Sequence, residues 1–391
     1  MLPIKITETF KQFVDSEKSS ALLLLGCTVF SLIVANSAMG PAYAHFWHLP
    51  IAGMGLQHWI NDGLMAVFFL LIGLELEREI YSGELSSLRN ALLPLFAALG
   101  GILTPAAIHF AFNMGTPTQA GVGIPMATDI AFALGVLAIL GSRVPLSLKV
   151  FVVAFAVIDD LGAIIVIATL YTAEVSALYL AGAALVWLLL FIANKWLRWM
   201  HMAPYLVGGA LLWWLMLKSG VHATLAGVLL AFAIPYSARS DDETSPSHRL
   251  EHHLHKPVAF LILPLFALAN TGVVIGSDWA AGLAQDNSLG ILVGLVVGKP
   301  LGVVAFCWLA IVTGVASLPD GMRWSHLVGA GMLGGIGFTM AIFIGSLAFA
   351  GDPVSIDASK LAVFVASLVA GVLGYAWLRW VAPNQIGFDI H

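Results

Sequence analysis

The chain has 391 residues, of which 60% are hydrophobic and 10% are charged, and its formal net charge is −5 at pH 7. Soluble domains carry about 25% charged residues, so this composition excludes an ordinary soluble fold. Apolar runs of about 20 residues recur along the chain and also exclude disordered chains, disulfide scaffolds and DNA-binding modules. The composition indicates an all-α polytopic membrane protein.

Apolar runs separated by charged or Gly- and Pro-rich breaks predict a single transmembrane domain over residues 1–391, with twelve spans. The connection from Ala38 to Gln57 contains the turn formers Pro41, Pro50, Gly53 and Gly55, and we expect a small hairpin there. The longest polar interruption, Tyr236 to Lys256, is rich in acidic residues and histidines. The predicted spans lie near 14–36, 58–77, 91–112, 120–140, 149–171, 176–194, 203–217, 222–236, 257–275, 289–311, 325–349 and 360–382.

The distribution of basic residues predicts the orientation of these spans. With a cytoplasmic N-terminus, 14 of the 17 lysines and arginines fall on the cytoplasmic side, Lys218 and Lys360 fall outside, and Lys299 falls within a span. Short cytoplasmic loops of membrane proteins are enriched in Lys and Arg. We therefore expect both termini to be cytoplasmic.

Four charged residues lie near the centres of predicted spans: Asp129 in the fourth, Asp159 and Asp160 in the fifth, and Lys299 in the tenth. Each costs about 2.5–3.5 kcal/mol at such a depth on the insertion scale. Their charges sum to −2, a deficit that protons or a bound cation could supply. A purely structural cluster of buried ion pairs is the alternative.

Asp159 and Asp160 point about 100° apart on a helix, so they cannot face the same spot. One can line a cavity while the other pairs with a neighbouring helix. Lys299 is a candidate partner, and the sequence leaves open which aspartate it contacts.

Two spans are interrupted in matching places. The fourth carries Gly121, Gly123 and Pro125 directly before Asp129, and the eleventh carries a glycine-rich stretch, 331–337. A proline kink or a close-packed glycine interface would explain either alone. However, the third to fifth spans (about 91–171) and the tenth to twelfth (about 289–382) form triplets of opposite orientation. This pattern predicts inverted-topology repeats whose two discontinuous helices cross at the midplane, as in several transporter families including the one named below.

Several motifs, in this order along the chain, closely resemble those of bacterial NhaA-type sodium/proton antiporters, and the resemblance covers essentially the whole sequence. They are Trp59-Ile-Asn61-Asp62, Ala127-Thr128-Asp129-Ile-Ala-Phe-Ala-Leu-Gly135, Ile158-Asp159-Asp160-Leu-Gly162, Lys218-Ser-Gly220-Val-His222-Ala, Arg249-Leu-Glu251-His252, Gly298-Lys299-Pro300-Leu-Gly302 and Gly335-Ile-Gly337-Phe-Thr339-Met.

The resemblance implies a multi-pass protein of the bacterial inner membrane that exports Na⁺ or Li⁺ in exchange for external H⁺, electrogenically and under pH regulation. It implies no enzyme activity, no cofactor and no nucleic-acid partner, and it implies a homodimer in the lipid bilayer. It assigns Asp160 and Asp159 to the cation and proton site, with Thr128 nearby. It also implies that Asp129 and Lys299 are the electrostatic partners of the broken helices.

The family's pH-responsive region corresponds to two groups of residues near the cytoplasmic side. Histidine titrates near neutral pH, which suits this role. Solvated polar residues at a loop-to-helix junction are the alternative interpretation. The first group is Glu75, Arg78 and Glu79, and the second is Glu251, His252 and His255.

Two other functions use buried acids or a similar scaffold. An intramembrane aspartyl protease needs a Gly-x-Gly-Asp element, which the sequence lacks, and it has no role for Lys299. A sodium-coupled symporter for an organic solute needs polar anchors for that solute, and the predicted spans hold few beyond the candidate cation ligands.

Overall fold

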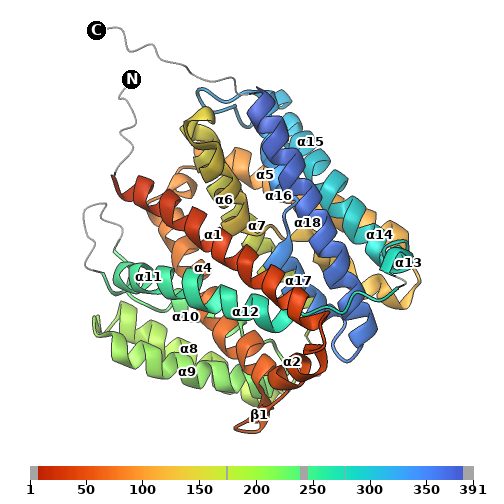
Figure 1. Ribbon diagram of the computed structural model, residues 1–391. Coiled ribbons are helices and arrows are strands. Elements are labelled where there is room, and N and C mark those ends of the chain that lie inside the picture. Colours follow the sequence, from red (N-terminus) through yellow and green to blue (C-terminus); the bar gives the residue numbers. More distant parts are fainter. Residues whose placement is uncertain (1–7, 173–174, 238–244, 278, 382–391) are drawn as a thin grey trace.

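The computed structural model describes residues 8–172, 175–237, 245–277 and 279–381, which form a helical bundle (Figure 1). Helical elements α and η and two short strands follow one another along the chain. They are α1 (Glu8–Ala35), α2 (Gly40–Trp47), β1 (Pro50–Ile51), β2 (Met54–Gly55), α3 (Leu56–His58), η1 (Trp59–Leu64), α4 (Met65–Tyr81), η2 (Glu84–Ser86), α5 (Leu88–Asn113), η3 (Pro117–Met126), α6 (Ile130–Leu140), η4 (Gly141–Arg143), α7 (Leu146–Leu170), α8 (Ala177–Lys195), α9 (Met202–Ser219), α10 (Leu225–Ala231), α11 (Pro246–Pro257), η5 (Val258–Ile262), α12 (Leu263–Asn270), α13 (Trp279–Leu283), α14 (Asp286–Val293), η6 (Gly294–Gly298), α15 (Lys299–Val312), α16 (Trp324–Gly334), α17 (Phe338–Ala348) and α18 (Pro353–Val381).

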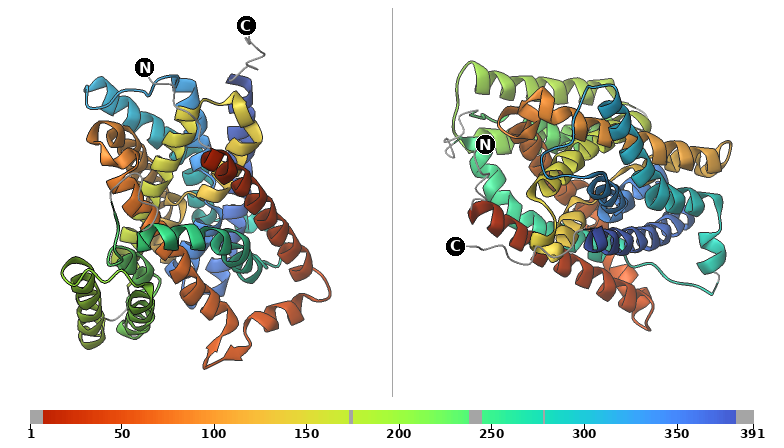
Figure 2. Two further views of the ribbon diagram at one scale, coloured as in Figure 1. Left: turned by 90° about the vertical axis from the view of Figure 1, so that its left-hand side faces the viewer. Right: turned by 90° about the horizontal axis from the view of Figure 1, so that it is seen from above.

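The described part of the chain is an all-α membrane protein. It contains nine helical segments long and apolar enough to cross a membrane, and the bent pair α16–α17 makes a tenth when counted as one span. Helices α8 and α9 pack on each other at one side of the bundle (Figure 2). The start of α1 and the end of α18 lie at the same end, opposite the β1–β2 hairpin (Figure 1 and Figure 2).

The hairpin expected between residues 38 and 57 is present. Pro50 pairs with Gly55 and Ile51 pairs with Met54 in an antiparallel register. The two turn residues, Ala52 and Gly53, have φ angles of 49° and 86°. Positive φ at both central positions gives the turn a twist that suits a two-residue hairpin.

The span predicted to begin near residue 257 starts on an earlier helix. Helix α11 begins at Pro246, where Ser245 accepts a hydrogen bond from the backbone N–H of His248 (3.4 Å). Serine at the N-cap followed by proline in the first turn is a favourable helix start. Pro257 lies inside the continuous helix, and the π-helical segment η5 follows it directly, where the backbone adapts to its missing N–H. The predicted start of this span near residue 257 was therefore wrong, because the helix already begins at Pro246 within the polar interruption.

Helices α5 and α15 approach each other backbone to backbone. A Cβ atom at Gly100 would lie 2.1 Å from the Gly302 carbonyl oxygen, and one at Gly302 would lie 2.0 Å from the Gly100 carbonyl oxygen. Small residues permit such close approach between helices in a membrane. This contact fixes the helix that begins with Lys299 against the rest of the bundle.

We expect Gly302→Val to destabilise the protein by about 3 kcal/mol, the upper end of the usual cost of overpacking, because backbone atoms cannot yield as a side chain can. Thermal unfolding of the purified protein in detergent measures the effect. Gly26→Val is the matched control, since a Cβ at this helical glycine would meet no atom within 4 Å. Equal unfolding midpoints for the two variants would contradict the packing argument.

Candidate functional site

The break between η3 and α6 lies against the break between α16 and α17. Residues 127–129 are not helical, and α16 and α17 are bent by 45° relative to each other. The backbone N–H of Asp129 donates to the Ile336 carbonyl oxygen (2.6 Å), and the Thr128 hydroxyl donates to the Gly334 carbonyl oxygen (2.8 Å). Each break therefore supplies hydrogen-bond partners for the other, as backbone groups that have left a helix inside a membrane protein require.

The sequence accounts for both breaks. Pro125 lacks a backbone N–H at the end of η3 and cannot continue a regular ladder of helical hydrogen bonds. In the other break, a Cβ at Gly335 would lie 2.4 Å from the Leu295 carbonyl oxygen, and one at Gly337 would lie 3.1 Å from the Ala127 carbonyl oxygen. Glycine is the residue that permits these approaches.

Asp129 accepts hydrogen bonds at the N-terminal ends of α6 and α17. One of its carboxylate oxygens accepts from the backbone N–H of Phe132 (3.3 Å), and the other accepts from the Thr339 N–H (3.0 Å) and hydroxyl. The Asp129 side chain is 3% exposed. A carboxylate in this position complements the partial positive charge of helix N-termini.

Lys299 pairs with Asp159, which decides the alternative that the sequence leaves open. Its Nζ atom lies 2.8 and 2.9 Å from the two carboxylate oxygens of Asp159, and both side chains are fully buried. The ammonium also donates to the Met126 carbonyl oxygen at the C-terminal end of η3. Lys299 thus carries its positive charge to a helix C-terminus, where a cation is favourable.

Asp160 is buried next to this pair but has a different environment. It is 1% exposed, and its Oδ1 atom has no hydrogen-bond partner among the described residues. The carboxylates of Asp159, Asp129 and Glu75 act on it electrostatically, and Lys299 opposes them. Thr128 lies beside the Asp159 carboxylate. The site therefore combines negative charge with a carboxylate oxygen that is free to accept a ligand.

Two contributors to the site have no assigned role in the sequence analysis. Thr339 donates a hydrogen bond to Asp129. It is the one polar side chain in the motif Gly335-Ile-Gly337-Phe-Thr339-Met, so the sequence could have indicated its role. The Met126 carbonyl accepts a hydrogen bond from Lys299. The sequence could not have indicated this contact, because every residue has a backbone carbonyl.

The residues predicted to respond to pH lie partly together, between α4 and α11. Arg78 is 2.9 Å from Glu251 and 2.8 Å from Glu79. His255 lies within electrostatic range of Glu251 and Arg78. His252 is exposed on α11, outside this ion-pair group. Glu75 is one turn before Glu79 on α4 and acts on Asp160.

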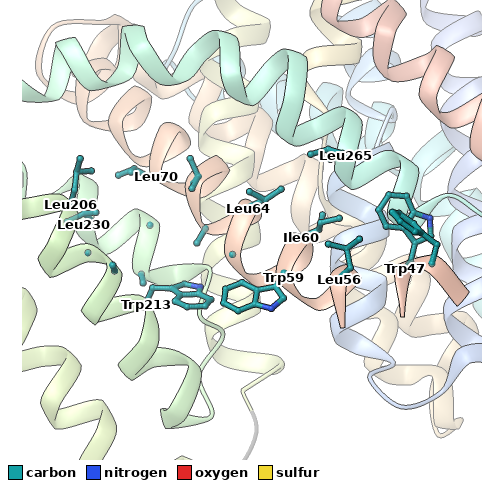
Figure 3. A pocket seen from close by; sticks show the side chains of 18 residues that line it. Trp47, Leu56, Trp59, Ile60, Leu64, Leu70, Leu206, Trp213, Leu230 and Leu265 are labelled. Atoms are coloured by element: carbon teal, nitrogen blue, oxygen red, sulfur yellow. The ribbon is translucent and has the colours of Figure 1, made fainter. Parts of the chain in front are cut away.

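A cavity of about 760 Å³ lies away from the charged cluster, between α4, α9 and α10 (Figure 3). Its lining is apolar and includes Trp59, Leu64, Trp213 and Leu230. It contains none of the four intramembrane charges. An apolar cavity cannot replace the hydration shell of Na⁺, so the candidate ion site is the buried cluster around Asp160.

Comparison with known proteins identifies the family. The sequence profile described as Na⁺/H⁺ antiporter 1 matches residues 11–378. The chain belongs to the NhaA family of Na⁺/H⁺ antiporters. It is similar to the Na⁺/H⁺ antiporter NhaA of Dechloromonas aromatica (strain RCB), with 63% identity over 97% of this chain and 98% of the relative. It is also 55% identical to Na⁺/H⁺ antiporter NhaA 1 of Flavobacterium johnsoniae, over 98% of this chain and 99% of the relative. It is 46% identical to the Na⁺/H⁺ antiporter NhaA of Vibrio parahaemolyticus, over 97% of this chain and 99% of the relative.

Membership in this family makes the chain a transmembrane transporter that exchanges Na⁺ and H⁺. This function differs from both alternatives of the sequence analysis, an intramembrane protease and a symporter for an organic solute. Within the residues that the structure describes, no group of three or more His, Cys, Asp or Glu side chains could hold a metal ion. Two aspartates, a threonine hydroxyl and backbone carbonyls are the oxygen atoms gathered at the breaks.

Proposed function

We propose that the antiporter exports Na⁺ in exchange for external protons at one site, formed by Asp160 and Asp159 with Thr128 beside them. The observation that carries this proposal is the buried Asp160 carboxylate, whose Oδ1 atom has no hydrogen-bond partner within the described part of the chain and which lies amid other carboxylates. A buried carboxylate in this setting needs a proton or a cation to balance its charge.

Competition between these two ligands gives the exchange. Na⁺ is a hard monovalent cation that prefers oxygen ligands, and unwound backbone beside the carboxylates supplies further carbonyl oxygens. When the site faces the cytoplasm, Na⁺ displaces protons from the aspartates; when it faces outward, protons displace Na⁺. Asp129 and Lys299 hold the two breaks in place through their hydrogen bonds.

The same proposal includes the twelve-span topology, with one transmembrane domain over residues 1–391. The triplet α5, η3–α6 and α7 and the triplet α14–α15, α16–α17 and α18 each have an interrupted middle member. The start of α1 and the end of α18 lie at one end of the bundle, which supports an even number of crossings (Figure 2). Together with the distribution of Lys and Arg, this supports cytoplasmic termini in a bacterial inner membrane.

We further expect a homodimer that carries Li⁺ as well as Na⁺ and needs no cofactor. Li⁺ is also a hard cation, so the same oxygen ligands suit it. Exchange of more than one proton for each Na⁺ moves net charge, so that the membrane potential drives sodium export.

Regulation by pH belongs to the ion-pair group of Arg78, Glu79 and Glu251. We expect Arg78→Gln to shift the pH dependence of exchange by about half a unit or more, because it removes the cation that pairs with two carboxylates. The exchange rate as a function of pH measures the shift. Arg89→Gln, at an exposed arginine nearby, is the control; coincident profiles would contradict a role for the group.

The experiment that tests the proposed exchange uses proteoliposomes with a preset pH gradient and an internal pH indicator. Addition of Na⁺ is expected to move protons in the native protein and not in the Asp160→Asn variant. Proton movement that ignores Na⁺, or that persists in the variant, would contradict the proposal. An imposed potassium diffusion potential is expected to change the rate if the exchange is electrogenic.

A further inference from the structure

Tyr171 joins the helix that carries the aspartates to the segment that precedes the first break. It lies at the C-terminal end of α7, and its hydroxyl donates to the Ala120 carbonyl oxygen (2.9 Å). The same hydroxyl accepts a hydrogen bond from the backbone N–H of Gly123 (3.0 Å). One side chain therefore satisfies a donor and an acceptor of η3, and it uses both functions of its hydroxyl group.

The fit around this hydroxyl is tight. A Cβ atom at Gly123 would lie 2.5 Å from the Tyr171 hydroxyl oxygen and 3.0 Å from a side-chain carbon of Val166. On its other side, the backbone carbonyl of Tyr171 is hydrogen-bonded to Nε2 of His222 (2.7 Å), which precedes α10. The backbone of Tyr171 is thus hydrogen-bonded to His222, while its side chain is hydrogen-bonded to η3.

The contact lies on the same short segment, η3, that ends at the Met126 carbonyl. Gly123 is three residues before Met126, whose carbonyl accepts from Lys299, and five residues before Thr128. Tyr171 follows Asp160 on the same helix three turns later. The hydroxyl therefore fixes how η3 and its oxygen atoms lie against the helix that supplies both carboxylates.

We propose that Tyr171 is a positioning residue for the cation site, whose hydroxyl places the Met126 carbonyl and Thr128 against Asp159 and Asp160. The inference rests on the proposed function of those aspartates. It predicts that loss of the hydroxyl weakens Na⁺ binding, since the ligand oxygens lose their fixed placement, while the exchange step itself continues.

The hydrogen bonds of the Tyr171 hydroxyl are not expected to respond to pH. Burial raises the pKa of Tyr171 to about 12. A tyrosine hydroxyl whose pKa is raised stays protonated near neutral pH, so it continues to donate to Ala120. Removal of this hydroxyl is therefore expected to leave the pH dependence of exchange unchanged, unlike a change in the ion-pair group on α4 and α11.

The test measures the Na⁺ dependence of exchange in proteoliposomes that contain the full-length protein. Tyr171→Phe removes both hydrogen bonds of the hydroxyl and is expected to raise KM for Na⁺ by roughly fivefold or more, the size that corresponds to two net hydrogen bonds, with a maximal rate within about twofold of native and an unchanged pH profile. Gly123→Ala keeps the tyrosine but displaces its hydroxyl, and it is expected to raise KM in the same way. Tyr179→Phe is the matched control, because it removes a tyrosine hydroxyl on α8, away from η3, and keeps the ring that packs against Trp214.

An unchanged KM in either folded variant would overturn the inference while native exchange still supports the proposed function. A fall in maximal rate with unchanged KM would also overturn it. Absence of Na⁺-coupled proton movement in the native protein would instead contradict the proposed function. If Tyr171→Phe fails to fold, Gly123→Ala alone decides between these outcomes.

Discussion

Replacement of Asp160 by asparagine is expected to reduce Na⁺-dependent proton movement by about 100-fold or more. Effects of this size follow removal of a principal polar group from a preorganised site. Asparagine keeps the shape of the side chain but can neither carry a proton through the cycle nor balance the charge of Na⁺. The initial rate of internal pH change after a sodium jump measures the effect.

Asp357→Asn is the matched control, because Asp357 is exposed and pairs with Lys360 across 3.5 Å near the start of α18. The Asp357 side chain is 54% exposed and its contact with the buried Lys360 is long, so this variant is expected to exchange at close to the native rate. Asp160→Asn should also fold normally, since it removes a buried charge whose Oδ1 atom accepts no hydrogen bond from any residue that the structure describes. A folded Asp160→Asn variant that exchanges ions like the control would contradict the assignment.

Replacement of Lys299 by methionine is expected to destabilise the protein by about 3–5 kcal/mol, because it leaves the fully buried Asp159 carboxylate without its counter-ion. The Met126 carbonyl at the end of η3 loses its donor as well. Thermal unfolding in detergent at neutral pH measures the loss.

The double variant Lys299→Met with Asp159→Asn separates a lost ion pair from lost packing. If the penalty arises from the uncompensated charge, the second substitution is expected to recover much of the stability, with a coupling of the size seen for side chains in direct contact. A double variant as unstable as the sum of the two single variants would show that the two residues act independently.

The sequence predicted where the site's charges lie, because a charged side chain inside an apolar run is costly enough to require a function or a partner. It could not assign Lys299 to Asp159 rather than to Asp160. The choice depends on how α7 and α15 are rotated relative to each other, and the sequence periodicity does not fix that rotation. The structure shows the pairing directly.

Hydropathy also missed part of the fold at the start of the span that contains α12. Helix α11 is rich in charged residues and histidines, so it reads as a polar connection although it is continuous with the next span. Its start was encoded instead by Ser245 and Pro246, a local capping signal. The role of Tyr171 was hidden for another reason, since its partners are backbone atoms of η3 that no residue type announces.

Binding of Na⁺ to the purified protein by calorimetry, repeated in buffers with different enthalpies of ionisation, tests most directly whether Na⁺ and protons compete for Asp160. The account predicts that Na⁺ binding releases protons from the native protein, and that Asp160→Asn shows neither strong binding nor proton release. Na⁺ binding without proton release, or equal proton release from the variant, would contradict it.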